Sequence, residues 1–176
     1  MPKFLEVFML ISISIILIAC TQKTGIRKME NKQMAPNFKL LDETGTFRTL
    51  EEFKGKKVVL YFYPKNDTPG CTKEACSFRD NSDLYAKNNI TVIGISFDSP
   101  ESHAEFKAKY NLPFILLADT DHKVARDYKA DKGVSGYLVP NRVTFLINEQ
   151  GEIIKTIENV NVSQHAQDIL KEFGIK

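Results

Sequence analysis

Residues 57–76 read KVVLYFYPKNDTPGCTKEAC, and this stretch decides which fold the chain is expected to adopt. Residues 57–63 form a continuous β-branched and aromatic run, which is typical of a strand covered on both faces. Residues 64–70 are rich in turn-forming residues and predict a loop. A helix is expected to follow, from about Cys71 to Lys87. The stretch therefore predicts a buried strand that leads through a loop into a helix with a cysteine at its start.

The segments beyond this stretch alternate between strand-like and helix-like patterns. Further strands are expected at residues 37–41, 91–96, 114–118, 142–147 and 152–157. Further helices are expected after Ser99-Pro100, over residues 119–128 and over the last segment, where Ala166, Ile169, Leu170 and Phe173 share a helical face. The last two strands flank a turn with Gly151 and predict a β-hairpin. The pattern indicates an α/β fold with a mixed central sheet, helices on both faces, and a C-terminal β-hairpin and helix.

Composition limits the function classes that fit the chain. With 176 residues, 43% of them apolar and 26% charged, the chain has room for one globular domain and a terminal extension. A formal net charge of +2 and the lack of a basic stripe argue against a nucleic-acid partner. The cysteines, Cys20, Cys71 and Cys76, fit no zinc-finger spacing. No metal site and no cofactor are expected.

Cys71 is placed where a helix N-terminus follows a buried strand. Unpaired backbone N–H groups and the positive end of the helix dipole favour an anion there, and the reactive form of a thiol is the thiolate anion. Thr68, three residues earlier, can turn its hydroxyl toward the sulfur or toward a substrate atom bound beside it. Pro64 offers an apolar wall that limits water near the sulfur. Cys71 is therefore a candidate nucleophile.

Pro64, Thr68 and Cys71 match the pattern Pro-x-x-x-Thr-x-x-Cys, and here the chain resembles the peroxiredoxins. The wider stretch Thr-Pro-Gly-Cys-Thr-x-Glu-Ala-Cys is similar to the peroxiredoxin Q, or bacterioferritin-comigratory, subfamily. The likeness extends over residues 36–176. It implies a thioredoxin-like fold and a peroxidase that acts on hydrogen peroxide and organic hydroperoxides, with Cys71 as the peroxidatic cysteine and Cys76 as the resolving cysteine.

The resemblance also implies roles for two charged residues. The family uses an arginine from a late strand beside the sulfur, and Arg142 matches it. A guanidinium stays charged and donates several hydrogen bonds in one plane, so it can hold a thiolate and polarise the peroxide O–O bond. Glu74 resembles a family position that orients this arginine. The alternatives are a surface arginine on an edge strand and a solvated glutamate in a first helical turn.

The five-residue spacing of Cys71 and Cys76 has a geometric consequence. On an intact helix their Cα atoms lie about 8.7 Å apart, whereas a disulfide needs less than about 7 Å. We therefore expect peroxide to form a sulfenic acid on Cys71, residues 71–76 to unwind, and an intramolecular Cys71–Cys76 disulfide to follow. A thioredoxin-like dithiol is expected to reduce this disulfide.

Two other functions fit parts of the sequence. Sco-type copper chaperones are membrane-tethered and thioredoxin-like, with two near cysteines and a distant histidine, for which His103, His122 and His165 are the candidates. These chaperones use Cys-x-x-x-Cys, however, and Thr68 and Arg142 have no task in copper binding. A disulfide oxidoreductase favours Cys-x-x-Cys, which the chain lacks. The default for each histidine is a solvent-facing side chain.

The N-terminus has the pattern of an export signal. Lys3 precedes an apolar run from Val7 to Ala19, which is too short for a bilayer-spanning helix but suits a signal peptide over residues 1–19. Leu17-Ile18-Ala19-Cys20 resembles a bacterial lipobox, in which the cysteine carries lipid. The expected product is an extracytoplasmic lipoprotein anchored to a membrane through Cys20, with a flexible tether over residues 20–35 and a peroxiredoxin domain over residues 36–176. A monomer is expected in preference to a dimer.

Overall fold

The computed structural model describes residues 33–131 and 138–175 of the chain. The predicted signal peptide, Cys20 and the tether up to residue 32 lie outside the described residues. The strands are β1 (Gln33–Met34), β2 (Lys39–Asp42), β3 (Phe47–Thr49), β4 (Lys57–Phe62), β5 (Ile90–Ser96), β6 (Ile115–Ala118), β7 (Val143–Ile147) and β8 (Glu152–Ile157). The helices are η1 (Leu50–Phe53, a 3-10 helix), α1 (Pro69–Asp80), α2 (Ser82–Lys87), α3 (Pro100–Tyr110), α4 (Lys123–Asp127) and α5 (His165–Glu172).

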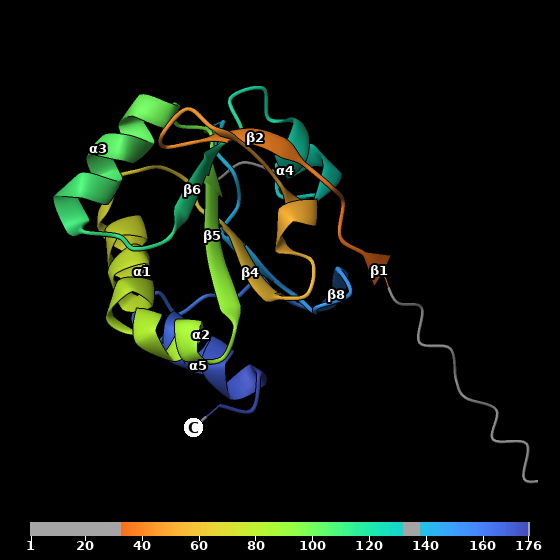
Figure 1. The fold of residues 1–176 in the computed structure, drawn as a ribbon. Coiled ribbons are helices and arrows are strands. Elements are labelled where there is room, and N and C mark those ends of the chain that lie inside the picture. The colour runs from red at the N-terminus through yellow and green to blue at the C-terminus, as the bar shows by residue number, and fades with distance from the viewer. Residues whose placement is uncertain (1–32, 132–137, 176) are drawn as a thin grey trace, which may run out of the picture. The chain divides into compact units, whose positions relative to one another are not determined.

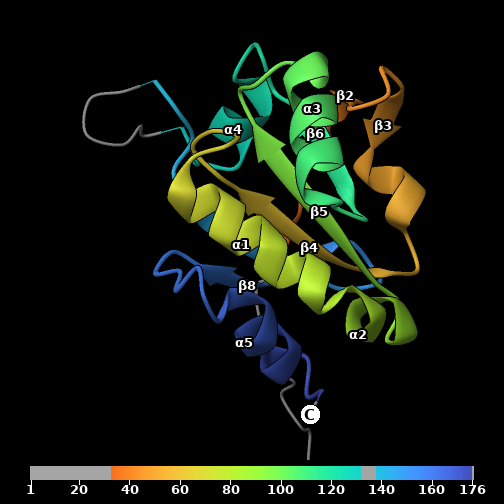
Figure 2. The ribbon, with the colours of Figure 1, turned by 90° about the vertical axis from the view of Figure 1, so that its left-hand side faces the viewer.

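The described strands form one mixed sheet in the order β1-β8-β7-β4-β5-β6-β2-β3. The central strands β4, β5 and β6 run parallel to one another, and β7 joins β4 antiparallel. The crossovers between the parallel strands carry the helices, with α1 and α2 between β4 and β5 and α3 between β5 and β6. This arrangement confirms the predicted α/β fold with a mixed sheet, which is seen along its length in Figures 1 and 2.

Strand β4 divides the core into two layers because its side chains alternate between the faces of the sheet. Val58, Leu60 and Phe62 belong to the layer that also contains residues of η1 and α4. Val59 and Tyr61 belong to the other layer, which contains residues of α1, α2, α3 and α5. Figure 2 shows α1 lying across the sheet on this second side, with α5 beside it. Helices therefore cover both faces, as predicted.

The helix that carries the cysteines differs from the prediction at both ends. It begins at Pro69, two residues earlier than expected, with Thr68 at the N-cap. It ends at Asp80 rather than continuing to Lys87, and α2 follows as a separate helix. The Asn81 side chain donates a hydrogen bond to the Ser77 carbonyl at 2.8 Å, a local bond that competes with the helical backbone ladder.

The sheet begins earlier than the expected domain boundary at Pro36. Strand β1 pairs antiparallel with β8, with Gln33 opposite Ile153. The Ala35 N–H donates to the Gly151 carbonyl at 2.9 Å, and its side chain is buried in the core. The prediction that residues 33–35 belong to the tether is therefore wrong. They join the sheet through backbone hydrogen bonds to residues far along the chain, which no local pattern indicates.

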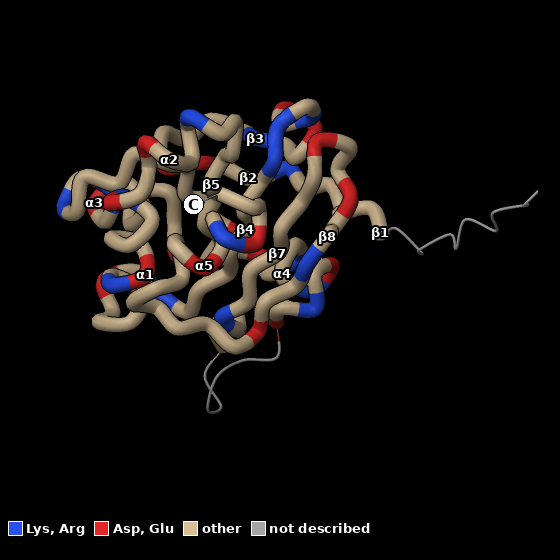
Figure 3. The backbone as a smooth tube through the Cα atoms, turned by 90° about the horizontal axis from the view of Figure 1, so that it is seen from below, with Lys and Arg blue, Asp and Glu red and all other residues tan. Residues whose placement is uncertain are grey.

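The charge and the hydropathy of the described residues have no unusual feature. Lysine and arginine are interspersed with aspartate and glutamate along the backbone seen in Figure 3. No helix within residues 33–131 and 138–175 is long and apolar enough to span a membrane.

Gly94 in the middle of β5 allows a close approach of two core side chains. A Cβ atom at this position would lie 2.8 Å from Tyr61 Cζ and 2.9 Å from Leu116 Cδ2. Both neighbours are buried, at 1% and 0% exposure, so neither has room to withdraw. The absence of a side chain at residue 94 is therefore required for the aromatic layer beneath α1.

We predict that Gly94→Ala lowers the free energy of unfolding by about 1–3 kcal/mol, because the methyl group overpacks the layer. Urea denaturation with and without Tyr61→Leu measures the effect. The double variant should lose less than the sum of the single variants, because the shorter side chain removes one of the two clashes. Strict additivity would show that Tyr61 is not the residue that excludes the methyl group.

Candidate active site

The loop between β4 and α1 is held by a buried polar network. The Asn66 N–H donates to Asp98 Oδ2 at 2.9 Å, and the Asn66 side chain accepts from the Tyr63 hydroxyl at 2.7 Å and donates to Ser102 Oγ at 2.9 Å. His103, at 0% exposure, lies 3.1 Å from the Asn66 amide nitrogen through Nδ1 and 3.1 Å from the Leu117 carbonyl through Nε2. The loop is thereby fixed to β5 and α3 just before the helix begins.

A second set of contacts fixes the loop at Asp67. This residue has a φ of 60°, a left-handed conformation that is uncommon outside glycine and asparagine. Its carboxylate accepts from Lys109 Nζ and from the Tyr110 hydroxyl, each at 2.6 Å. These bonds lower the pKa of the Asp67 carboxyl. The end of α3 therefore holds the residue that precedes the N-cap of α1.

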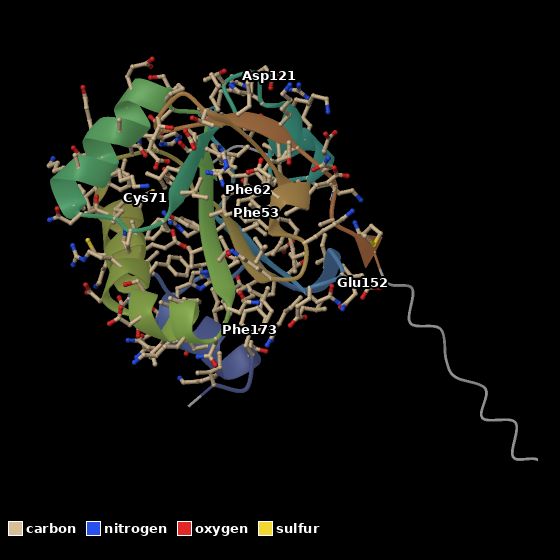
Figure 4. The ribbon with its side chains drawn as sticks, viewed as in Figure 1. Phe53, Phe62, Cys71, Asp121, Glu152 and Phe173 are labelled. Atoms are coloured by element: carbon tan, nitrogen blue, oxygen red, sulfur yellow. The ribbon has the colours of Figure 1, made fainter. Side chains whose placement is uncertain are left out.

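Cys71 lies in the first turn of α1 with its side chain directed into the protein. The residue is 2% exposed, and Figure 4 shows it at the N-terminal end of the helix. Thr68 at the N-cap has extended backbone angles and its carbonyl accepts the first helical bond, from the Thr72 N–H at 2.9 Å. Pro69 has no N–H, so Gly70 and Cys71 contribute the N–H groups that have no acceptor within the helix. The predicted placement of the cysteine at a helix mouth is confirmed.

Arg142 reaches Cys71 from the residue before β7, across 71 positions of sequence. Its Nη2 donates to Cys71 Sγ at 3.2 Å, and its Nη1 donates to Glu74 Oε2. An added Cβ on Gly70 would lie 3.5 Å from the same Nη2, so the guanidinium lies close against the first turn of α1. The arginine and the cysteine that the sequence nominated are therefore in contact, and the surface-arginine alternative is wrong.

Glu74 is completely buried one turn after Cys71. Its exposure is 0%, which contradicts the alternative of a solvated glutamate. Burial raises the pKa of the Glu74 carboxyl to about 7, although the charge and hydrogen bond of Arg142 act in the opposite direction. Its second oxygen, Oε1, has no hydrogen-bond partner. A carboxylate with this pKa changes its protonation state near neutral pH.

Thr68 and Pro64 lie half-buried at the edge of the site. The Thr68 hydroxyl donates to the Lys65 carbonyl at 3.1 Å, and the bond spans three residues of the loop. The hydroxyl proton is thus occupied, while the oxygen lone pairs are available as acceptors. Thr68 is therefore expected to act as a hydrogen-bond acceptor. That Pro64 forms an apolar wall beside the sulfur stays a prediction.

Cys76 lies on the same intact helix as Cys71 and is a free thiol of intermediate exposure. Both cysteines are reduced, with continuous α-helix between them. The structure is therefore that of the reduced form, before any disulfide.

The histidines are not arranged for copper. His103 and His165 are buried, at 0% and 2% exposure, so the solvent-facing default was wrong for both. His122 is half-buried and stacks on Phe97 with ring centroids 3.8 Å apart. Within residues 33–131 and 138–175, no three His, Cys, Asp or Glu side chains gather to hold a metal ion. The copper-chaperone alternative is not supported.

The sequence indicated no role for Asn66, and it suggested His103 and His165 only as copper ligands, not as buried members of this site. Asn66 lies in the loop before the cysteine, but asparagine is a common turn-forming residue, so its presence there did not indicate a buried network. Burial of the histidines depends on strands and helices far along the chain, so no local pattern identifies it.

Comparison with known proteins agrees with this geometry. Residues 32–156 match the AhpC/TSA family. The chain is 47% identical over 146 residues to a putative peroxiredoxin bcp of Coxiella burnetii, covering 81% of this chain and 97% of that one. It is 44% identical over 147 residues to peroxiredoxin Bcp of Bacillus subtilis, covering 81% and 94%.

Solved structures show the same likeness. The crystal structure of peroxidoxin BcpB from Mycobacterium tuberculosis superposes with a TM-score of 0.74 at 35% identity, covering 80% of this chain and 93% of that one. The bacterioferritin comigratory protein of Xanthomonas campestris, described with trapped intermediate and ligand complexes for alkyl peroxide reduction, gives a TM-score of 0.74 at 33% identity, covering 78% and 90%.

We predict that Glu74 makes the protein less stable as the pH rises from 4.5 to 7. Its folded pKa of about 7 lies above the ordinary 4.5, so the folded state binds more protons than the unfolded state in this window. His165 acts oppositely, because burial lowers its pKa to about 4, below the ordinary 6.5. Relative to Glu74→Gln, the wild type should lose up to about 3 kcal/mol of unfolding free energy between pH 4.5 and 7.

Urea denaturation at several pH values measures this difference. Glu105→Gln, which changes an exposed glutamate of α3, is the matched control and should follow the wild type. A constant difference between wild type and Glu74→Gln across the range would rule out the raised pKa.

Proposed function

Because the chain belongs to the AhpC/TSA family and is a thiol-dependent peroxidase, we propose that Cys71 is its peroxidatic cysteine and Cys76 its resolving cysteine. The observation that carries the assignment is the 3.2 Å contact between Arg142 Nη2 and Cys71 Sγ at the N-terminus of α1. A guanidinium and a helix N-terminus both stabilise an anionic sulfur. Cys76, the other thiol among the described residues, has the Arg79 guanidinium nearby but lies in the interior of α1, away from the helix N-terminus.

In the first step the Cys71 thiolate attacks the nearer peroxide oxygen. A sulfur–oxygen bond forms and the O–O bond breaks, so the sulfur is oxidised to the sulfenic acid and the leaving oxygen is released as water or an alcohol. Arg142 polarises the O–O bond but keeps its proton. The leaving oxygen takes its proton from the attacked peroxide hydroxyl or from solvent.

Three groups around the sulfur are suited to orient the peroxide. The Thr68 oxygen can accept a hydrogen bond from the peroxide hydroxyl, because its own proton is directed to the Lys65 carbonyl. The N–H groups of Gly70 and Cys71 are suited to donate to the oxygen under attack. Pro64 shields this space from bulk water. Hydrogen peroxide and organic hydroperoxides share the O–O–H group that these contacts address.

Resolution requires the first turns of α1 to unwind. With about 8.7 Å between the two Cα atoms on an intact helix, the sulfenic acid and Cys76 do not meet. After unwinding, the Cys76 sulfur attacks the Cys71 sulfur, a disulfide forms, and the sulfenic oxygen leaves as water.

Contacts at both ends of this segment limit how far it unwinds. Asp67 is held by Lys109 and Tyr110 before the helix. Arg79 is held after Cys76, because its Nη1 donates to the Tyr110 carbonyl at 2.9 Å. Arg79 also faces the Cys76 sulfur, although Asp80 contributes most to its raised pKa. The end of α3 thus anchors the chain on either side of the two cysteines.

Peroxiredoxins use peroxide substrates and thioredoxin-like reductants. For this chain, we propose that a thioredoxin-like dithiol reduces the Cys71–Cys76 disulfide and restores the helix. We propose further that the protein is a monomer, which light scattering of the purified chain tests.

We predict that Cys71→Ser abolishes peroxide consumption with excess dithiothreitol, by about a thousandfold or more, because the nucleophile is lost. Without a thiol, Cys76→Ser should consume one equivalent of peroxide and leave a sulfenic acid that dimedone traps on Cys71. Peptide mass spectrometry identifies the site of each product. Cys20→Ser, which removes the third thiol, is the matched control and should retain wild-type activity.

Full activity in Cys71→Ser would overturn the assignment of the nucleophile. A wild-type disulfide that joins Cys71 to a cysteine other than Cys76 would overturn the assignment of the resolving residue.

We propose that the N-terminus makes the protein an extracytoplasmic lipoprotein of a bacterial membrane. The support is the sequence Leu17-Ile18-Ala19-Cys20 at the end of an apolar run. Lipid chains on Cys20 would tether the peroxidase domain through the polar segment that follows, with each buried methylene contributing about 0.8 kcal/mol.

We predict that the mature protein expressed in a bacterium begins at Cys20 and carries lipid, as mass spectrometry of its N-terminal peptide would detect. Cys20→Ser should remove the lipid and release the protein from the membrane fraction, while Cys76→Ser serves as a thiol-loss control that stays attached. An unmodified Cys20 in a chain that still begins at Met1 would contradict this localisation.

A further inference from the structure

Helix α5 brings a buried histidine to the rear of the peroxidatic centre. His165 is the first residue of α5 and is 2% exposed. Its Nε2 lies 2.8 Å from Thr144 Oγ1 and 3.7 Å from Glu74 Oε1. Thr144 and Glu74 are both at 0% exposure. The catalytic cycle described above gives His165 no role.

Side chains from β7, α1 and α5 form a chain of contacts around the site. Arg142 and Thr144 are two residues apart at β7, so their side chains are directed to the same face of the sheet. Glu74 extends from α1 toward this face and His165 extends from α5. The sequence of contacts runs from Cys71 to Arg142, from Arg142 to Glu74, and from Glu74 to His165.

Glu74 Oε1 is the atom in this chain of contacts that lacks a hydrogen bond. One carboxylate oxygen accepts from Arg142, while the other is buried without a hydrogen-bond partner. A buried carboxylate with an unpaired oxygen is costly, because water no longer solvates it. The nearest polar group described for it is His165 Nε2, and 3.7 Å exceeds a hydrogen-bond distance.

The charges around this pair set the state of the imidazole. Burial lowers the pKa of His165 to about 4, with the positive charge of Arg142 acting in the same direction and Asp168 of α5 in the opposite one. The imidazole is therefore neutral at neutral pH. A proton on Nε2 suits both neighbours of this nitrogen, because it donates to Thr144 Oγ1 at 2.8 Å and keeps a lone pair away from the Glu74 carboxylate. Two further titratable groups lie near these contacts, Cys71 and Tyr61, and burial raises the pKa of the Tyr61 hydroxyl.

We propose that His165 is a positioning residue of the peroxidatic centre: its Nε2–H, held by Thr144, directs the positive end of its dipole at the free oxygen of Glu74, and Glu74 in turn fixes the Arg142 guanidinium on the Cys71 sulfur. The inference rests on the roles proposed for Cys71 and Arg142.

The docking of α5 has other supports. The Tyr85 hydroxyl donates to the Ala166 carbonyl at 2.7 Å, and Ile169 and Leu170 are buried in the layer beneath α1. His165 packs edge-on against Phe78, with ring centroids 5.5 Å apart. A variant of His165 therefore keeps most of the contacts that hold the helix, and its activity can be measured in the folded protein.

The test compares His165→Leu, which removes the polar group, with His165→Gln, which keeps an N–H near the position of Nε2. The rate of Cys71 oxidation by hydrogen peroxide is measured in single turnover from pH 5.5 to 9, with acid quench and mass spectrometry of the Cys71 peptide. At neutral pH we expect His165→Leu to react about tenfold more slowly and His165→Gln to recover most of the rate. His122→Asn, a histidine variant distant from the site, should match the wild type.

The pH profile distinguishes positioning from packing. Without His165 the charged form of Glu74 is less stabilised, so the inflection due to Glu74 should move to higher pH. In a Glu74→Gln background, that inflection should be absent and His165→Leu should have little further effect. Equal losses from His165→Leu with and without Glu74, or an unmoved inflection, would overturn the proposal. Failure of the peroxidatic assignment is a separate result, since Cys71 of the wild type would then not be oxidised.

Discussion

The structure depends on one ion pair that is buried among apolar side chains. Arg142 and Glu74 meet between β7 and α1, beneath a helix whose inner face is otherwise aromatic and aliphatic. Neither charge is tolerated there alone, because desolvation would exceed any gain from packing. Together they also present the second guanidinium nitrogen to the Cys71 sulfur. The demand for charge pairing inside the fold thus fixes the geometry of the reactive centre.

The rest of the fold positions this ion pair from both sides. The central strands put β7 next to β4, so the residue before β7 lies beside the helix that follows β4. The loop into that helix is held by Asn66 and Asp67, which fixes the helix mouth before the cysteine. Gly94 leaves room for the Tyr61 ring on which the helix rests. The first turn of α1, which carries Cys71, is therefore held by the loop before it and by the packed layer below it.

A feature of the fold or of the site was predictable from the sequence where it depends on residues that are close together in the chain. The strand at 57–63, the Ser99-Pro100 helix start and the Gly151 hairpin were predicted, because each depends on residues that are near in sequence. The burial of Glu74 was left open, because it depends on an arginine 68 residues away, while first-turn glutamates are ordinarily solvated. The short strands β1 and β3 were missed, since they exist only through pairing with β8 and β2.

The same ion pair connects the chemistry to the shape change. Glu74 lies between Cys71 and Cys76, inside the segment that we propose unwinds before a disulfide forms. Unwinding would therefore separate Glu74 from Arg142, and water would have to solvate both groups. Arg142 already has 22% of its side chain exposed, whereas Glu74 has none and must move out with the helix. The carboxylate leaves more easily when its second oxygen is unpaired, as it is here. In the proposed cycle, renewed pairing of the two charges favours the helix once the disulfide is reduced, so the contact proposed to stabilise the thiolate also favours the return to the helical form.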